Sequence, residues 1–254
     1  MAKMGITKAL AAVALLAGIA VLPVQADHHA NIVAAVANEA RPADDVKRDG
    51  DRKPAEVLAF SGVKPGMTVV DINSGSGYYS EMLSYAVGAK GKVYAHNGPI
   101  YFDFVKNQVA TRYTDRLPNV IQLAEGSENI NVKEGSVDLA MIVLAYHDYY
   151  YLPKGGRSES ADVAGVLSTI YKSLKKGGAF VVVDHVGPDG SGPEAGNTTH
   201  RIEPAFVMEQ VTAAGFTYFG ESSVLENAAD DVGQSVFGKD IRGRTNRFIY
   251  KFVK

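Results

Sequence analysis

The alternation of short apolar runs with helical patterns constrains the fold of this chain more than any other feature. Apolar runs rich in β-branched residues occur at 67–72, 91–96, 119–124, 136–145, 179–185, 216–222 and 247–253. Apolar residues at helical spacing occur at 78–87, 100–116, 162–174 and 203–214. Because a helix between two strands returns the chain to the same end of a sheet, this alternation predicts parallel strands.

The last two apolar runs differ, because no convincing helical pattern separates them. They should therefore pair antiparallel at one edge. The sequence predicts an α/β fold of the doubly wound, Rossmann-like type, with a seven-stranded, mostly parallel sheet and a closing antiparallel strand pair. Residues 63–254 would form this domain, and helical patterns in 27–62 would form a cap before it. The segment 187–199, rich in Gly, Pro and Ser, is predicted to be a mobile surface loop.

Residues 1–26 have the layout of a secretory signal peptide. Lys3 and Lys8 precede an apolar stretch at 9–22, which is shorter than the roughly 20 residues that span a bilayer. We expect cleavage after Ala26, export to the periplasm or the medium, and no lasting membrane anchor. Loss of the two lysines takes the formal net charge from −2 to −4, so the chain has no electrostatic reason to bind nucleic acid. A chain that begins at Asp27 would place His29 third, an arrangement suited to Cu(II) or Ni(II).

The segment DINSGSGYYS follows the first apolar run and combines a strand end, a small-residue turn and a helix start. In sheets of this type, ligands bind beyond the carboxyl ends of the strands. Gly75 and Gly77 let the backbone approach a ligand closely, and the next helix offers free N–H groups. The turn is therefore predicted to bind a nucleotide-like ligand.

The order of elements, MTVVDINSGSGYYSEML, LKKGGAFVVVDH and the terminal strand pair together resemble the class I S-adenosylmethionine-dependent methyltransferases, in particular an exported group of predicted methyltransferases with YHD at the end of the fourth strand. The resemblance covers about residues 53–254. It implies S-adenosyl-L-methionine as cofactor, bound at positions that fall on Asp71, Asn73, Gly75, Gly77, Asn97, Ser127 and Glu128.

Two of these positions depart from the family pattern, because Asn73 replaces a Gly and Asn97 replaces an acid that accepts from the ribose hydroxyls. An amide at position 97 should weaken cofactor binding by about 1–2 kcal/mol. NAD is the alternative ligand, but the sixth position of its turn falls on Ser80 instead of Gly or Ala, and its ribose acid is missing as well. A serine hydrolase is disfavoured, because neither Ser76 nor Ser191 has glycines two residues to either side.

Four histidines fall at or near predicted strand ends: His96, His147, His185 and His200. The candidate catalytic residues are the pairs His147-Asp148 and Asp184-His185, because an imidazole beside a carboxylate can take a proton from a methyl acceptor. His147 would be the base, oriented by Asp148 or Asp184. The alternative is structural: Asp148 caps the next helix, and the tyrosines at 149–151 cover the sheet edge or form a wall for the acceptor.

A divalent metal and an anionic acceptor are two further hypotheses for this edge. DHVGPDG at 184–190 loosely resembles metal-dependent O-methyltransferases of this fold, which would place an ion between Asp148 and Asp184; the metal-free arrangement is favoured. The arginines expected to fold over this edge would bind an anionic acceptor or remain solvated charges, and they are Arg201, Arg242, Arg244 and Arg247.

The predicted function is S-adenosylmethionine-dependent methyl transfer to a small-molecule or lipid-like acceptor, outside the cytoplasm. Since S-adenosylmethionine is made in the cytoplasm, an exported enzyme would need a supply of it outside. The alternative is a non-catalytic extracytoplasmic binding protein that keeps the fold for another ligand. The His and Asp groups at the strand ends favour the enzyme, because a mere binding protein has no evident use for them.

Overall fold

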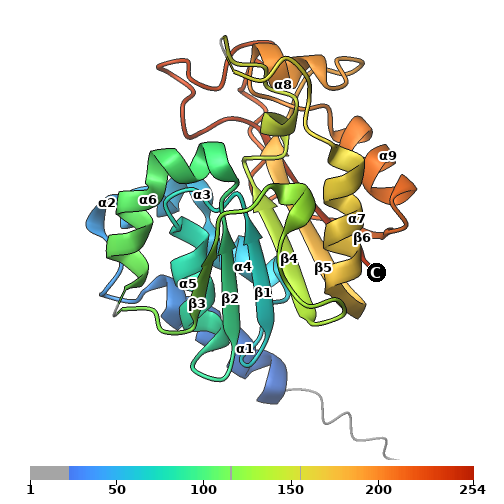
Figure 1. The fold of residues 1–254 in the computed structure, drawn as a ribbon. Coiled ribbons are helices and arrows are strands. Elements are labelled where there is room, and N and C mark those ends of the chain that lie inside the picture. The colour runs from blue at the N-terminus through green and yellow to red at the C-terminus, as the bar shows by residue number, and fades with distance from the viewer. Residues whose placement is uncertain (1–22, 115, 155) are drawn as a thin grey trace, which may run out of the picture.

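The computed structural model of the chain describes residues 23–254, except residues 115 and 155. Its centre is a seven-stranded sheet in the order β3-β2-β1-β4-β5-β7-β6 (Figure 1). The strands are β1 (Thr68–Ile72), β2 (Lys92–His96), β3 (Val120–Leu123), β4 (Val137–Val143), β5 (Leu174–His185), β6 (Thr217–Glu221) and β7 (Arg247–Val253). β7 pairs antiparallel with β5 and β6, whereas the other pairings are parallel. The predicted fold class is confirmed.

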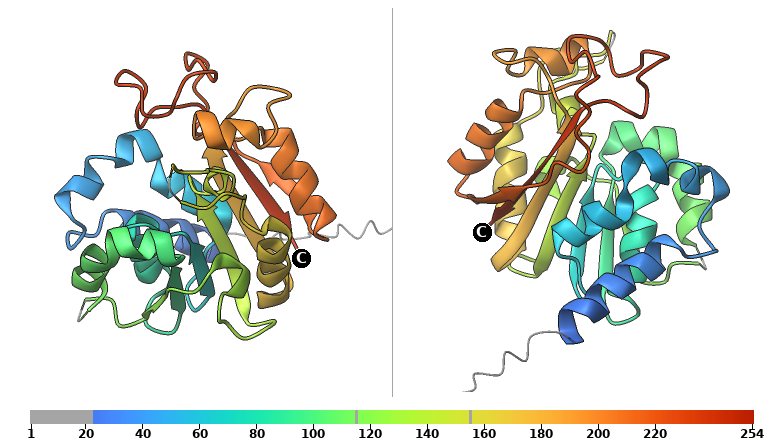
Figure 2. Two further views of the ribbon diagram at one scale, coloured as in Figure 1. Left: turned by 45° about the horizontal axis from the view of Figure 1, so that its top comes forward. Right: turned by 180° about the vertical axis from the view of Figure 1, so that it is seen from behind.

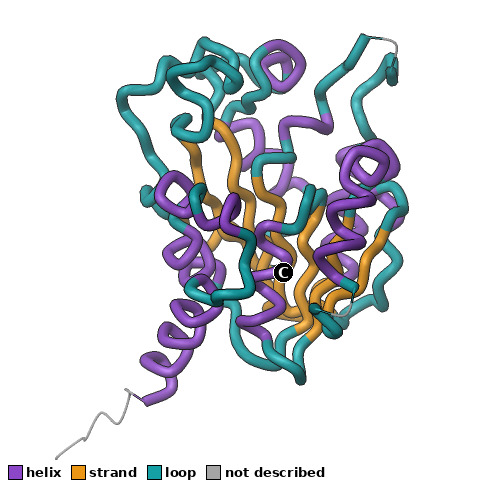
Figure 3. Tube along the Cα trace, turned by 90° about the vertical axis from the view of Figure 1, so that its left-hand side faces the viewer, coloured by secondary structure: helices purple, strands orange, loops and turns teal. Residues whose placement is uncertain are grey.

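Helices cover both faces of this sheet (Figure 3). One face carries α1 (Pro23–Val36), α4 (Pro54–Ser61) and α5 (Tyr78–Val87), with α6 (Pro99–Tyr113) against β2; the other carries α7 (Val163–Ser173) and α9 (Pro204–Ala213). Alternate strand residues face opposite layers, so Val69 packs with α5 and Val70 with α7. Shorter helical segments are α2 (Ala43–Val46), α3 (Asp49–Arg52), η1 (Ser127–Asn129), η2 (His147–Tyr149) and α8 (Glu194–Thr198).

The carboxyl ends of the parallel strands meet at the edge drawn at the top of Figure 1, where α8 and the segment 222–246 gather above them (Figure 2). β4 and β5 end side by side, since Val143 is paired with Val183. The η2 turn that follows β4 therefore lies next to Asp184 and His185 at the end of β5.

The cap that precedes β1 is tied to the domain by a buried cluster of charges. The Arg112 guanidinium of α6 lies 2.7 Å from the carboxylates of both Asp45 in α2 and Glu81 in α5. The predicted signal peptide lies outside the described residues, except for residues 23–26, which begin α1. No helix in residues 23–254, the two gaps aside, is long and apolar enough to cross a membrane.

The prediction of a loop throughout 187–199 is wrong for the last part of the segment, which forms α8. Gly196 accounts for the difference. A Cβ atom at this position would lie 2.7 Å from the carbonyl oxygen of His147, so glycine lets α8 pack directly on η2. This close approach places α8 beside the candidate catalytic histidine.

Candidate functional site

The turn between β1 and α5 holds three residues in the left-handed region: Asn73 (φ 50°), Gly75 (φ 57°) and Gly77 (φ 90°). Asn tolerates this conformation better than most residues, so Asn73 can replace a glycine here. A Cβ at Gly75 would meet no atom within 4 Å, whereas one at Gly77 would lie 2.4 Å from the Tyr113 hydroxyl. Gly77 is thus required by packing, whereas the space beside Gly75 is open.

Asn97 and His96, at the end of β2, support the turn from behind. The Asn97 Oδ1 atom accepts a hydrogen bond from the Gly75 N–H at 2.8 Å, and its Nδ2 donates to the Gly75 carbonyl at 3.0 Å. The His96 ring spans from the Asn73 N–H to the carbonyl of Glu125. The Asn97 amide is fully buried, is engaged inside the turn and does not line the cavity described below.

Asp71, the last but one residue of β1, lies beneath the turn and is 2 % exposed. One oxygen of its carboxylate accepts a hydrogen bond from the Ser80 hydroxyl at 2.6 Å. Burial raises the pKa of Asp71 to about 7, and the bonds from Ser80 offset only part of this effect. Asp71 therefore acts on the turn from within the core.

We expect Asp71→Asn to remove a pH dependence of stability. Because the native state binds this proton more tightly than the unfolded chain, whose carboxyl has a pKa near 3.8, the free energy of unfolding falls as pH rises from about 4 to 7. The full linkage is about 4 kcal/mol, and the buried amide of Asn retains part of the cost. In urea unfolding the variant should be more stable than wild type at pH 8, by roughly 2–3 kcal/mol, and less stable than wild type at pH 4, by about 1–2 kcal/mol. A constant difference across this range would contradict the pKa assigned to Asp71.

A cavity of about 1080 Å³ opens at the carboxyl ends of the strands. Small-molecule pockets are usually about 300–1,000 Å³, so this one has room for a nucleoside-sized donor together with an acceptor. The predicted site residues that line it are Asn73, Ser127, Glu128, His147, Asp148 and His185. The other predicted site residues are not part of the lining, and these are Asp71, Gly75, Gly77, Asn97 and Asp184.

His147 is held in place by Asp184, which is completely buried. Its Nδ1 lies 2.7 Å from Asp184 Oδ1, and its backbone N–H donates to Oδ2 at 2.9 Å. Burial alone would lower the pKa of the imidazole, but the Asp184 and Asp148 carboxylates together outweigh burial, and the net shift is upward. The Asp148 carboxylate faces the other nitrogen of the same ring, with Oδ1 3.3 Å from Nε2 of His147.

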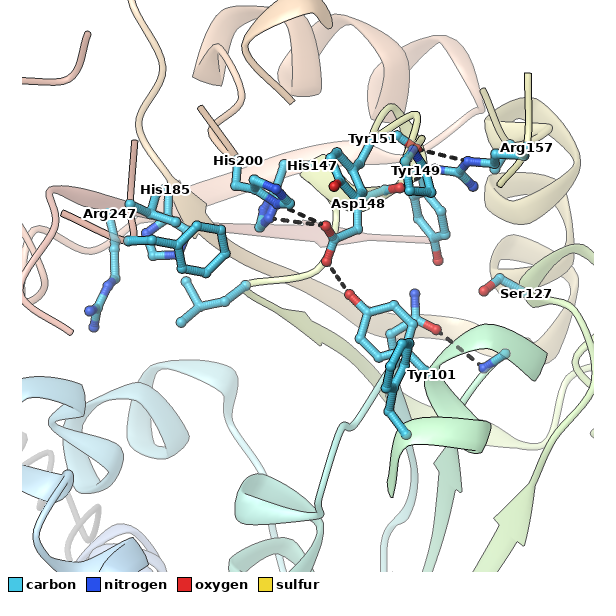
Figure 4. Close-up of a pocket in the computed structure, with 18 of the residues that line it drawn as sticks. Tyr101, Ser127, His147, Asp148, Tyr149, Tyr151, Arg157, His185, His200 and Arg247 are labelled. Carbon is cyan, nitrogen blue, oxygen red and sulfur yellow. Dashed lines mark hydrogen bonds and ion pairs between the residues drawn. The ribbon is translucent and has the colours of Figure 1, made fainter. Parts of the chain in front are cut away.

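Asp148 occupies the middle of the site (Figure 4). Its Oδ2 accepts a hydrogen bond from the Tyr101 hydroxyl, and its Oδ1 lies 3.3 Å from Nδ1 of His200. Burial would raise the pKa of this carboxyl, yet His200, His147 and Tyr101 lower it overall. His185 behaves in the opposite way: burial, the neighbouring His147 and Arg247 hold its pKa well below the usual range, so it is neutral.

The structure adds one tyrosine to which the sequence gave no role, and it places a second, one of the tyrosines expected at the sheet edge, in the cavity. Tyr101 lies in α6 and not at the end of a strand, so the sequence did not indicate it. Its hydroxyl donates to the Asp148 carboxylate. Tyr149 lines the cavity near Ser127, and its buried hydroxyl has no hydrogen-bond partner among the described residues (Figure 4). A buried donor of this kind is usually satisfied by a ligand or by water.

The arginines divide into two groups. Arg48, Arg52, Arg242 and Arg247 line the cavity at its cap end. Burial and the proximity of Arg52 lower the pKa of Arg247 to about 10. Arg201 is instead fully buried in a paired arrangement with Asp230, and Arg244 lies outside the lining.

Comparison with known proteins supports this fold. No protein-family model matches the chain, and no curated protein matches its sequence. Solved structures do match. An S-adenosylmethionine-dependent methyltransferase from Aquifex aeolicus has 21% identity and a TM-score of 0.57, with 81% of this chain and 97% of that chain covered. One from Mesorhizobium loti has 14% identity and the same TM-score of 0.57, with 82% and 100% covered.

The cyclase SpnF is also similar, with 16% identity, a TM-score of 0.54, and 80% of this chain and 81% of that chain covered. The structural neighbours are mainly class I methyltransferases. These similarities establish the fold of the chain, a class I methyltransferase fold. Because SpnF is described as a cyclase, the reaction has to be argued from the residues of the site.

Proposed function

We propose that this chain transfers a methyl group from S-adenosyl-L-methionine to a small-molecule or lipid-like acceptor outside the cytoplasm. One observation carries the proposal. A single cavity joins the cofactor-side positions Asn73, Ser127 and Glu128 to the pair His147-Asp148. A donor bound on one side and an acceptor at the histidine would thus meet in a common space, which is what group transfer requires.

The residues present fit most of the cofactor. The unpartnered hydroxyl of Tyr149, beside Ser127, can bond a polar atom of the nucleoside, and Gly75 leaves room for close approach. Arg48 and Arg52 offer positive charge for a carboxylate at the cap end of the cavity. The ribose is the exception, because the Asn97 amide is already hydrogen-bonded to the backbone of the turn. We therefore expect binding weaker than a carboxylate at position 97 would give.

When bound, the cofactor supplies a methyl group that is already activated on a sulfonium. The remaining task of the protein is to orient the acceptor and to remove its proton. Nε2 of His147 takes this proton, while Asp184 holds Nδ1 and stabilises the resulting imidazolium. Tyr149, Tyr151 and Phe237 line the cavity around this point and suit an acceptor with a flat or apolar body.

The extracytoplasmic location rests on the sequence of residues 1–26. Mass spectrometry of the exported fraction should find a chain that begins at Asp27. An intact Met1 on a cytoplasmic protein would contradict both export and the amino-terminal copper arrangement at His29.

The activity is tested with methyl-labelled S-adenosylmethionine and a panel of phenols, amines, carboxylic acids and lipid extracts. The proposal predicts label on an acceptor, together with an equal amount of S-adenosylhomocysteine. A chain that binds the cofactor but transfers no label to any member of the panel would favour the second candidate, a non-catalytic binding protein. The inward-turned Asn97 is the observation that favours this candidate, since the fold would have kept its turn while losing a ribose contact.

A further inference from the structure

We propose that His147, Asp148 and His200 bind a divalent transition-metal ion such as Zn²⁺ in the wall of the cavity. One ligand atom of each side chain lies within 4.8 Å of the others. His147 and Asp148 come from η2, whereas His200 follows α8, so the fold joins two segments far apart in the chain. This ion is distinct from one held between Asp148 and Asp184, because Asp184 lies buried behind His147.

The distances within the cluster match coordination better than hydrogen bonding. Asp148 Oδ1 lies 3.3 Å from Nε2 of His147 and 3.3 Å from Nδ1 of His200. This separation is longer than the usual 2.7–3.2 Å of an N–H···O bond. Two ligands that are each about 2.1 Å from one ion at a tetrahedral angle are about 3.4 Å apart.

Every member of the cluster is also oriented by a second contact. Asp184 holds Nδ1 of His147 at 2.7 Å, so Nε2 faces the cluster. Tyr101 engages Oδ2 of Asp148 and leaves Oδ1 directed toward the two rings (Figure 4). A carboxylate behind a ligating histidine is a regular feature of protein metal sites.

His200 is positioned by its backbone and by contacts with two aromatic rings. Its φ of 55° lies in the left-handed region, which only a few per cent of non-glycine residues adopt, His more often than most. Its ring lies 4.3 Å from that of Tyr151 and 4.8 Å from that of Phe237, measured between centroids. The adjacent Arg201 fixes the chain through its buried pair with Asp230.

Two imidazoles and one carboxylate suit zinc, cobalt or ferrous iron rather than magnesium or calcium. Three protein ligands leave at least one position open to the cavity, as in catalytic rather than structural sites. Ion binding goes beyond the proposed methyl transfer, since it needs no methyl donor. Because the ion and the acceptor's proton would use the same nitrogen of His147, the metal-bound chain would bind an oxygen of the acceptor at the open position instead.

The test uses the full chain without an affinity tag, stripped with a chelator and then dialysed against a small molar excess of Zn²⁺ or Co²⁺. Elemental analysis should find one ion per chain, and bound Co²⁺ should give the absorption bands of a low-symmetry nitrogen and oxygen site. His200→Ala, at a side chain that is partly exposed, should bind at least tenfold more weakly. Asp184→Asn, which touches no ion, should lose roughly 10–100-fold in affinity through His147.

The double variant His28→Ala/His29→Ala is the matched control, because it removes two histidines outside the cluster and should bind as wild type does. Circular dichroism establishes that each variant is folded. Wild-type protein that retains no ion, or equal retention by wild type and folded His200→Ala, would overturn the metal site. Neither result bears on methyl transfer, which the label assay measures separately.

Discussion

Replacement of His147 by Asn is expected to lower methyl-transfer turnover roughly 10²–10⁴-fold, the usual contribution of a positioned proton acceptor. Asn keeps a polar side chain of similar reach beside Asp184, and the backbone N–H of residue 147 still donates to that carboxylate. Affinity for S-adenosylhomocysteine should change little, because the cofactor-side residues Ser127 and Glu128 are untouched. The measurement is the initial rate of label transfer together with calorimetric affinity.

Tyr146→Phe is the matched control for this variant. The Tyr146 ring is buried beside His147, but its hydroxyl bonds Gln210 at 3.0 Å and does not line the cavity. Its removal should leave turnover within about twofold, since a single neutral hydrogen bond contributes about 1 kcal/mol to stability and none to the reaction. Equal turnover in wild type and His147→Asn would reassign His147 to structure.

Replacement of Arg201 by Met is expected to lower the free energy of unfolding by about 3–5 kcal/mol, or the melting temperature by roughly 6–20 °C. The guanidinium and the Asp230 carboxylate are both fully buried and form two hydrogen bonds, at 2.8 and 3.0 Å. Arg201 also donates to the carbonyls of Val186 and Gln234. Without it, Asp230 remains as a buried charge without its cation.

Two further variants separate this effect from a general loss of packing. Arg201→Met combined with Asp230→Leu should recover about half of the loss, because a buried pair replaced by apolar groups costs far less than a broken one. Arg244→Met, at an exposed arginine whose side chain donates to the Asp240 carbonyl, should stay within about 0.5 kcal/mol. A double variant that is less stable than Arg201→Met would contradict the role assigned to the pair. Thermal unfolding followed by circular dichroism measures all three.

The fold could be predicted from the sequence because each helix or strand is indicated by residues that lie close together in the chain. The run at 247–253 forms β7 at the bounds expected, and 78–87 forms α5, since apolar periodicity and flanking glycines decide such elements. The helix α8 escaped prediction because its stability comes from the contact of Gly196 with η2, which composition does not encode. Tertiary contact outweighed the Gly and Pro content of the segment.

The sequence predicted a site residue only where its role follows from its position at the end of a strand. His147, Asp148, Asp184 and His185 meet because β4 and β5 are neighbours, which the strand order implies. The sequence pattern did not predict the direction in which a side chain points. Asn97 lies at the expected position and turns inward, and Arg201 faces Asp230 instead of the cavity.

The contribution of Tyr101 and of His200 depends on distances between segments about 50 residues apart, which no periodicity reports. His200 was visible only as a histidine near a strand end. Its approach to Asp148 depends on the left-handed backbone at this position and on α8, neither of which the sequence pattern predicted.

Calorimetric titration of the chain with S-adenosylhomocysteine tests the central claim most directly, because it needs no acceptor. The wild type should bind one molecule per chain. Gly75→Val should abolish binding, because it would add a branched side chain to the turn that is proposed to hold the cofactor, at a φ that disfavours such residues. Gly135→Val introduces the same residue at a similar φ of 63°, also with no atom within 4 Å, at the opposite end of β4; it should bind as wild type does. Absence of heat from the wild type at millimolar ligand, or equal binding by Gly75→Val, would contradict the cofactor site.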